Sequence, residues 1–71
     1  MSYLSEIITK RLRESKGKRI LVFLKNNFRY EGKLIDSDDS VFEFFDYREK
    51  RNMIKSIADI RELEVESDGE V

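Results

Sequence analysis

The sequence predicts a mainly β fold, in which an N-terminal helix precedes a strongly bent, five-stranded antiparallel sheet that forms a small open barrel. Two observations lead to this prediction. Between residues 19 and 65, five segments rich in branched and aromatic residues are separated by short polar turns. The second segment contains Gly32, and a glycine inside a strand is typical of a sharp bend or a bulge. A long strand bent at this position would let a small sheet curl back on itself.

The start of the chain has the periodicity of a helix. Ser2 is suited to the N-cap position, and Gly17 is well placed to end the helix. The apolar stripe consists of Leu4, Ile7, Ile8 and Leu12. Because one short amphipathic helix cannot bury its stripe alone, we expect it to lie across the sheet or across one open end of it.

The five strands are expected at residues 19–25, 28–36, 41–46, 52–55 and 57–65. Asn26 and Asn27 separate the first two strands as a two-residue hairpin turn, where asparagine tolerates the required positive φ. One face of the second strand is expected to carry Phe28, Tyr30, Gly32 and Leu34. Phe42 and Phe44 share a face of the third strand and are expected in the core.

The chain is long enough for one domain, which we assign to residues 1–65, and the acidic segment 66–71 is expected to be a disordered tail. A domain of this size buries only about 60% of its unfolded surface and commonly needs an additional stabiliser. The sequence has no Cys and no His, so disulfides and zinc–thiolate sites are excluded. Association with other copies is the stabiliser that remains.

Catalysis and metal binding are not expected. No nucleophile–base pair can be written from this composition, so the chain is not read as an enzyme and no cofactor is expected. The acidic loop at residues 36–40 lacks the glycine and the distal glutamate of a calcium loop. No apolar run reaches the roughly 18 residues of a membrane span, and no signal-peptide pattern is present. We therefore expect a soluble, cytoplasmic protein without a membrane partner.

Three segments carry a recognisable pattern. Residues 24–32, LKNNFRYEG, combine an apolar residue, an asparagine turn, alternating strand residues and a glycine. Residues 39–44, DSVFEF, place an aspartate before alternating apolar positions, and residues 55–57 read KSI. With the order of one helix and five strands, these segments resemble the Sm-like family of RNA-binding ring proteins, which includes the Sm and LSm proteins and bacterial Hfq. The resemblance covers residues 4–65.

The resemblance implies a ring of identical subunits that binds single-stranded RNA. In this family the fourth strand of one subunit pairs with the fifth strand of the next, which closes a ring of six or seven copies. We favour a hexamer, with a heptamer as the alternative. Ring closure would also satisfy the unpaired edges of a small sheet, which otherwise invite aggregation.

The resemblance also implies three RNA-binding surfaces. The pore-side pocket would consist of Asp39, Ser40, Val41, Lys55 and Ser56. The opposite-face site would consist of Phe23, Asn27, Arg29 and Glu31. The basic rim, repeated around the ring as a multivalent belt, would consist of Lys10, Arg11, Arg13, Lys16 and Lys18. The structural role in the fold would fall to Gly32, Phe42 and Phe44.

Several residues depart from the family pattern. Val41 stands where an aromatic residue stacks on a base, and the acidic Glu43 lies nearby. Stacking is worth about 1–3 kcal/mol per base, so its loss should weaken the pore-side pocket. On the opposite face, Glu31 replaces a glutamine that reads a base edge. For Phe23 core packing, and for Arg29 a solvated strand face, stay open as alternatives.

We therefore expect an RNA-binding ring that holds U-rich or A-rich single strands and acts in RNA metabolism or riboregulation, with other RNA-processing proteins as further partners. The alternative is a ring that serves as a protein-assembly module with little RNA affinity. Val41, Glu43 and the acidic tail favour the alternative. The cations that dominate residues 10–19 favour RNA binding, although the formal net charge is only −1 and they could also simply keep the surface solvated.

Overall fold

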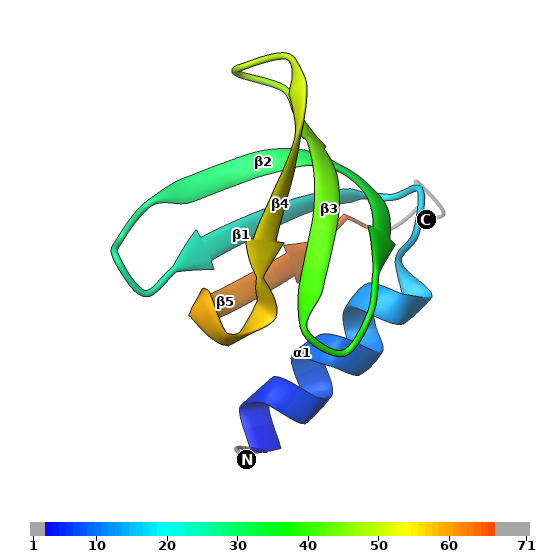
Figure 1. Cartoon of the computed structure of the whole chain (residues 1–71), viewed down its shortest axis with the longest axis vertical. Coiled ribbons are helices and arrows are strands. Elements are labelled where there is room, and N and C mark those ends of the chain that lie inside the picture. Colours follow the sequence, from blue (N-terminus) through cyan, green and yellow to red (C-terminus); the bar gives the residue numbers. More distant parts are fainter. Residues whose placement is uncertain (1–2, 67–71) are drawn as a thin grey trace.

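The computed structural model describes residues 3–66 and has the mainly β fold that the sequence predicts (Figure 1). Its elements are α1 (Tyr3–Glu14), β1 (Arg19–Leu24), β2 (Arg29–Ser37), β3 (Val41–Asp46), β4 (Arg51–Ser56), the short 3-10 helix η1 (Ile57–Asp59) and β5 (Ile60–Val65). The strands form one antiparallel sheet in the order β4-β3-β2-β1-β5.

A small open barrel was expected, and the five strands form a curved sheet that does not close into a barrel. Within residues 3–66, β4 pairs only with β3 and β5 pairs only with β1, so these two strands form the edges of an open sheet. The sheet is strongly curved nonetheless, as the sweep of β2 shows (Figure 1). The backbone groups on the outer sides of β4 and β5 are therefore left without a strand partner inside the described chain.

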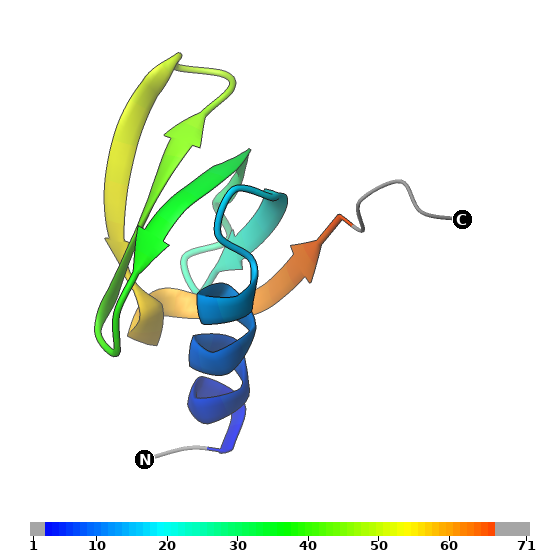
Figure 2. The same ribbon diagram turned by 90° about the vertical axis from the view of Figure 1, so that its right-hand side faces the viewer.

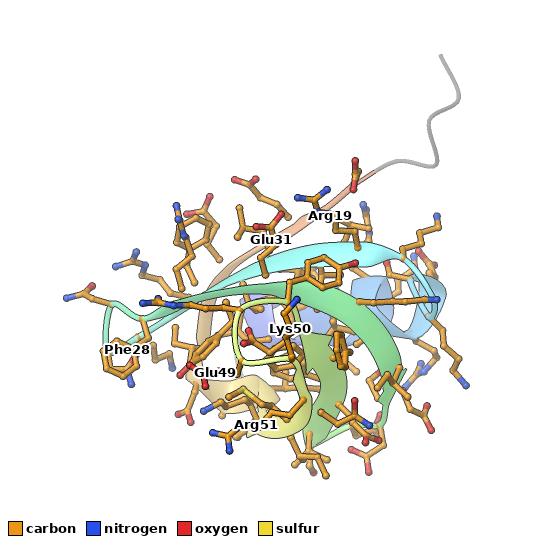
Figure 3. All side chains as sticks on the ribbon, turned by 90° about the horizontal axis from the view of Figure 1, so that it is seen from above. Arg19, Phe28, Glu31, Glu49, Lys50 and Arg51 are labelled. Atoms are coloured by element: carbon orange, nitrogen blue, oxygen red, sulfur yellow. The ribbon has the colours of Figure 1, made fainter. Side chains whose placement is uncertain are left out.

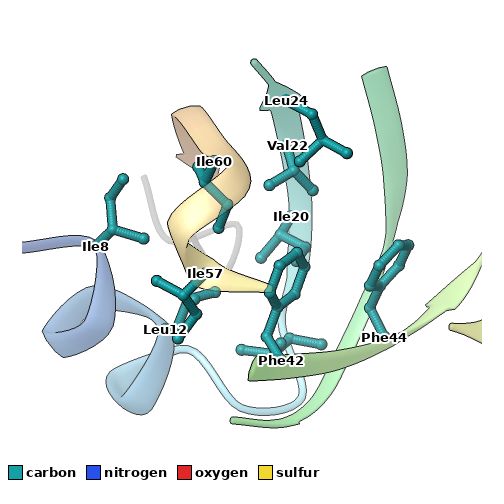
Figure 4. Packing of buried hydrophobic residues seen from close by; sticks show 10 residues of the cluster. Ile8, Leu12, Ile20, Val22, Leu24, Phe42, Phe44, Ile57 and Ile60 are labelled. Carbon is teal, nitrogen blue, oxygen red and sulfur yellow. The ribbon is translucent and has the colours of Figure 1, made fainter. Parts of the chain in front are cut away.

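The hydrophobic core lies between one face of the curved sheet, α1 and η1 (Figure 4). Phe42 and Phe44 are fully buried and stacked, with ring centroids 5.4 Å apart, so their prediction as core residues is confirmed. The other buried apolar residues are Ile8, Leu12, Ile20, Val22, Leu24, Leu34, Ile57 and Ile60. Burial alternates along β1 and β3, as expected for strands that pack only one face on the core.

Helix α1 packs against β2 and η1 at one end of the sheet (Figure 2). Ile8 and Leu12 are buried as predicted, but Ile7 is 44% exposed, so its prediction as a buried residue is wrong. Ile7 lies about 100° around the helix from Ile8, at the border of the apolar stripe. Ser2 and the side chain of Leu4 lie outside the described residues. No helix in the described part of the chain is long and apolar enough to cross a membrane.

The chain leaves α1 through a short turn that contains Gly17. The helix ends at Glu14, and Gly17 adopts a left-handed φ of 85°, as a helix-terminating glycine does. Its N–H then donates to the Leu34 carbonyl at 2.8 Å, and the Leu34 N–H donates to the Lys18 carbonyl at 2.9 Å. These two hydrogen bonds attach the turn to β2 before β1 begins.

Gly32 does not form a bulge, which was one of the two features predicted for it, the other being a sharp bend. Strand pairing runs regularly through it, with Ile20 on one side and Asp46 on the other, so the predicted bulge at this residue is wrong. The irregularity in the pairing of β2 with β3 lies between Leu34 and Asp36 instead. A Cβ atom at Gly32 would overlap the carbonyl oxygen of Phe45 on β3. Glycine is needed because the two strand backbones approach too closely for a side chain.

The hairpin between β1 and β2 is one residue longer than predicted. Leu24 and Phe28 flank a loop of residues 25–27, closed by the Asn27 N–H donating to the Leu24 carbonyl at 2.9 Å and by the Leu24 N–H donating to the Phe28 carbonyl at 2.8 Å. Asn27 has a φ of 72°, whereas Asn26 does not have a positive φ. The loop is thus the three-residue type, in which only the last residue is left-handed.

The end of the sheet also differs from the prediction. Residues 57–59, expected at the start of the fifth strand, form η1, because the buried Ile57 turns into the core and the Ser56 hydroxyl caps the turn by accepting the Ala58 N–H at 3.3 Å. Glu66 was assigned to the tail, but its N–H donates to the Arg19 carbonyl at 3.0 Å. The rest of the predicted tail, residues 67–71, lies outside the described residues.

Candidate nucleic-acid interface

The structure brings most of the pore-side pocket together at one end of the β3–β4 pair. Val41 is paired with Ser56, and the Ser40 carbonyl accepts the Ile57 N–H at 2.8 Å. Lys55 is paired with Phe42, so its side chain lies on the core face of the sheet, whereas Val41 and Ser56 share the other face. These residues are therefore neighbours in the β3–β4 ladder, but their side chains do not all lie on the same face of the sheet.

Lys55 is already in contact with an aromatic ring. Its ammonium lies 4.8 Å from the ring centroid of Tyr30 on β2, and its side chain is half-buried. This cation–π contact holds the charge over the inner face of the sheet. Val41 is 39% exposed and offers no ring to a base, as the sequence indicated.

The loop before β3 is ordered by Asp38, which was not among the predicted site residues. Its carboxylate accepts the N–H groups of Ser40 at 2.7 Å and of Val41 at 2.9 Å. The hydrogen bonds from Val41 and then Ser40 lower the pKa of Asp38. Asp39 points away and forms an ion pair with Arg13.

The opposite-face residues lie together on the outer face of β1 and β2. Phe23 is paired with Arg29, and the pair Leu21 and Glu31 follows along the same face. Phe23 is half-buried, so its ring is neither in the core nor fully exposed. The Asn27 amide oxygen accepts a hydrogen bond from Arg61 on β5 at 3.0 Å.

Glu31 is engaged in an ion-pair cluster with Arg19 (Figure 3). The Arg19 guanidinium donates to the Glu31 carboxylate, lies 3.6 Å from the Glu66 carboxylate and 5.7 Å from the ring centroid of Tyr47. The hydrogen bond and the charge of Glu31 raise the pKa of Arg19. Glu31 is therefore compensated by a neighbouring charge and is not a free acceptor for a base edge.

The basic rim is partly neutralised by acids. Arg13 pairs with Asp39 at 2.8 Å, and Lys16 pairs with Asp36 at 3.3 Å, so the acidic β2–β3 loop faces the end of α1. The pKa of Asp36 is lowered, first by the Ser37 N–H and then by Lys16. Arg11 lies 4.0 Å from its helix neighbour Glu14. Lys10 is exposed, and Lys18 is half-buried.

An open groove of about 660 Å³ lies between the β1–β2 hairpin and the β3–β4 turn. We call it the tip groove; its lining comes from residues 27–31 and 46–49. Phe28 is 58% exposed at the groove; it was expected inside the second strand, on one face with Tyr30, Gly32 and Leu34. β2 begins only at Arg29, so Phe28 belongs to the hairpin loop and is not held to the alternation of the strand. Tyr47 is 40% exposed at the other wall.

Phe28, Tyr47 and Arg48 line the tip groove and were not among the predicted site residues. One signal could have found them: an aromatic residue is followed directly by arginine both at residues 28–29 and at residues 47–48. Aromatic rings interleaved with cations are typical of single-strand binding surfaces. What the sequence could not show is that the two dipeptides line the same groove.

No protein-family model matches the chain, and a search of curated proteins found no match either. Among residues 3–66, no group of three or more acidic side chains is placed to hold a metal ion.

Proposed function

We propose that this chain assembles through its sheet edges into a homo-oligomeric ring, with six copies favoured over seven, and that the ring binds single-stranded RNA in RNA metabolism or riboregulation. The observation that carries the proposal is the strand order β4-β3-β2-β1-β5 after an N-terminal helix. This order leaves one edge strand at each border of the sheet. It also gathers Ser40, Val41 and Ser56 at one end, where a ring would repeat them around its axis.

The two edges complement one another in charge. Arg48, Lys50 and Arg51 outnumber Glu49 among the exposed charges of β4 and its preceding turn, whereas on β5 Glu62 and Glu64 outnumber Arg61. Ile54 on β4 is 64% exposed, and a neighbouring strand would cover it. Pairing the β4 edge of one copy with the β5 edge of the next would satisfy both backbones. Head-to-tail contacts of this kind form a ring when the rotation between copies closes on itself.

Mass spectrometry under native conditions tests the assembly. We expect a species with six or seven times the 8.5 kDa of the chain. A folded monomer at micromolar concentration would contradict the ring.

Fluorescence anisotropy with labelled oligo-U and oligo-A, measured at several salt concentrations, tests RNA binding. We expect affinity above that of a random polyanion of equal charge for at least one of the two RNAs. If the protein binds the polyanion as tightly as both RNAs, it is not a specific RNA-binding protein.

The second candidate is a ring that serves as a protein-assembly module. Two observations favour it: Arg13 and Lys16 of the basic rim are held by carboxylates, and Lys55 lies over Tyr30 on the other side of the sheet from Val41. A ring mass without RNA affinity would support this candidate over the first.

A further inference from the structure

The hydrogen bonds of β4 show which of its residues face the open edge. The Ile57 N–H donates to the Ser40 carbonyl at 2.8 Å, one step beyond the last residue pair of the β3–β4 ladder. In antiparallel strands, residue pairs that exchange hydrogen bonds alternate with pairs that do not. Lys55, two residues before Ile57, therefore bonds to β3 and has its side chain on the core face. Ile54 turns its N–H and C=O groups to the open edge and its side chain to the outer face.

On β5 the relation between edge and face is reversed. The Glu66 N–H donates to the Arg19 carbonyl at 3.0 Å, one step beyond the last residue pair of the β1–β5 ladder. By the same alternation, Glu62 bonds to β1, and its side chain lies on the outer face. Leu63 turns its backbone groups to the open edge, and its side chain is half-buried against the core. The edge-facing residues of the two borders therefore carry their side chains on opposite faces of the sheet.

This difference favours one direction of pairing between copies. In an antiparallel pair, opposite residues that exchange hydrogen bonds both face the partner strand, and their side chains share one face. Ile54 would then meet Leu63 of the next copy, and Lys55 would meet an acidic residue of its β5. In a parallel pair, a residue that faces the partner strand lies beside one that faces away. Ile54 would then lie beside an acid, and Lys55 beside Leu63, so only antiparallel pairing matches the side chains.

The register follows from the same side chains. Setting Ile54 opposite Leu63 pairs nearly the whole of β4 with β5 of the next copy. A shift of two residues in one direction would set Ile54 opposite the charged Arg61. A shift in the other direction would leave only residues 54–56 opposite β5. The first register covers Ile54, which is 64% exposed, with an apolar side chain that already belongs to the border of the neighbour's core.

This register sets Lys55 opposite Glu62, and both charges are available. Glu62 is exposed and, within residues 3–66, its carboxylate has no ion-pair partner. The Lys55 ammonium lies over the neutral ring of Tyr30 and has no carboxylate partner in the described part of the chain. Opposite residues that do not exchange hydrogen bonds have Cα atoms only about 4.5 Å apart, so the two side chains can reach one another.

We infer that Lys55 is an interface residue, which forms an ion pair with Glu62 of the next copy while Ile54 packs on Leu63 of that copy in an antiparallel β4–β5 pair. The inference rests on the proposed ring and names the side chains that join its subunits. It removes Lys55 from the pore-side pocket that the resemblance implied, because the same ammonium cannot be held by a carboxylate and remain free for RNA.

Charge reversal, followed by native mass spectrometry over a dilution series, tests the ion pair. Lys55→Glu and Glu62→Lys should each raise the concentration at which the ring dissociates about tenfold, because like charges then face one another at every interface. The chain that carries both substitutions should return to the wild-type value. Lys33→Glu on the middle strand β2 and Glu6→Lys on α1 are matched controls, because both residues are exposed and lie away from the two edges.

Disulfide formation tests the direction and the register, because the chain has no cysteine of its own. Opposite residues that exchange hydrogen bonds have Cα atoms about 5.5 Å apart, which is within the reach of a disulfide. Ile54→Cys combined with Leu63→Cys should therefore give, on oxidation, a covalent ladder of copies on a non-reducing gel. Ile54→Cys combined with Glu64→Cys is the control, because an antiparallel interface places those two side chains on opposite faces.

Circular dichroism of each variant establishes that the subunit remains folded. A wild-type ring whose dissociation is no more sensitive to the two reversals than to the controls, or a double reversal that does not restore the ring, would overturn the inference and leave the proposed ring intact. Cross-linking through position 64 in place of position 63 would do the same. If the wild-type protein is a monomer at micromolar concentration, the proposed ring and this interface fail together.

Discussion

Replacing Gly32 by alanine should destabilise the fold more than any other glycine substitution in the described chain. The added Cβ would overlap the Phe45 carbonyl oxygen, which belongs to the backbone of β3 and cannot rotate away. β3 would have to move away from β2, next to the stacked rings of Phe42 and Phe44. Overpacking of this kind costs typically 1–3 kcal/mol. Because the obstacle is backbone rather than a flexible side chain, we expect a loss of about 3 kcal/mol.

Thermal unfolding followed by circular dichroism measures this loss. For a domain of this length, each kcal/mol lowers Tm by roughly 4–8 °C, so Gly32→Ala should melt on the order of 12–24 °C below the wild type. The free energy of unfolding of a small domain is only about 5 kcal/mol or little more. The variant should therefore be largely unfolded at the Tm of the wild type.

Gly17 supplies the matched control. A Cβ at Gly17 would meet nothing within 4 Å, so Gly17→Ala carries only the conformational cost of a φ of 85°, about 1–2 kcal/mol. Asparagine tolerates that region, so Gly17→Asn should recover part of the loss, whereas Gly32→Asn should be at least as unstable as Gly32→Ala. The steric explanation would be refuted if Gly32→Ala cost less than Gly17→Ala, or if asparagine restored stability at position 32.

Three further predictions concern charge, assembly and pH. Asp36→Asn combined with Asp39→Asn should free two cations of the basic rim, raise affinity for oligo-U and steepen its salt dependence, with Asp59→Asn as the control; an unchanged salt slope would exclude the rim from RNA binding. Ile54→Asp on the β4 edge should shift the native mass to the monomer while the circular dichroism spectrum stays native; a persistent ring would show that this edge is not the interface. The pKa of Asp38 is lowered in the folded state, so its stabilising contribution is present above the unfolded value of about 3.9 and is lost as pH falls through the lower folded value. Tm should therefore drop below about pH 4, and Asp38→Asn should flatten that drop; an equal drop in the variant would remove Asp38 as a cause.

Much of the fold could be predicted because its signals are local. A run of branched and aromatic residues located β1, and alternation located β3, each within one residue of its observed ends. The burial of Phe42 and Phe44 follows from the alternation in β3. The errors lie where an element ends or reverses: Phe28 leaves the strand pattern in the hairpin, and residues 57–59 form η1. At such points the backbone conformation depends on what it must pack against or cap, which a periodic pattern does not encode.

The candidate site was predicted less well than the fold. The residues of each predicted surface were found near one another, but their availability depends on partners distant in the sequence. Asp39 pairs with Arg13 and Glu31 pairs with Arg19, across 26 and 12 positions of the chain. A sequence motif identifies which positions could contact a ligand. The charge that these positions present to the ligand depends on the ion pairs that they form in the folded chain.

The sequence by itself determined the order of one helix and five strands and part of the core, including Phe42 and Phe44, because hydrophobic periodicity is a property of neighbouring residues. Tertiary structure alone decided that β4 and β5 remain unpaired edges, that Gly32 admits the backbone of β3, and that residues 28–29 meet residues 47–48 around one groove. Each of these depends on how strands far apart in the chain are paired and curved. That arrangement is set by the packing of the whole sheet and not by any single segment.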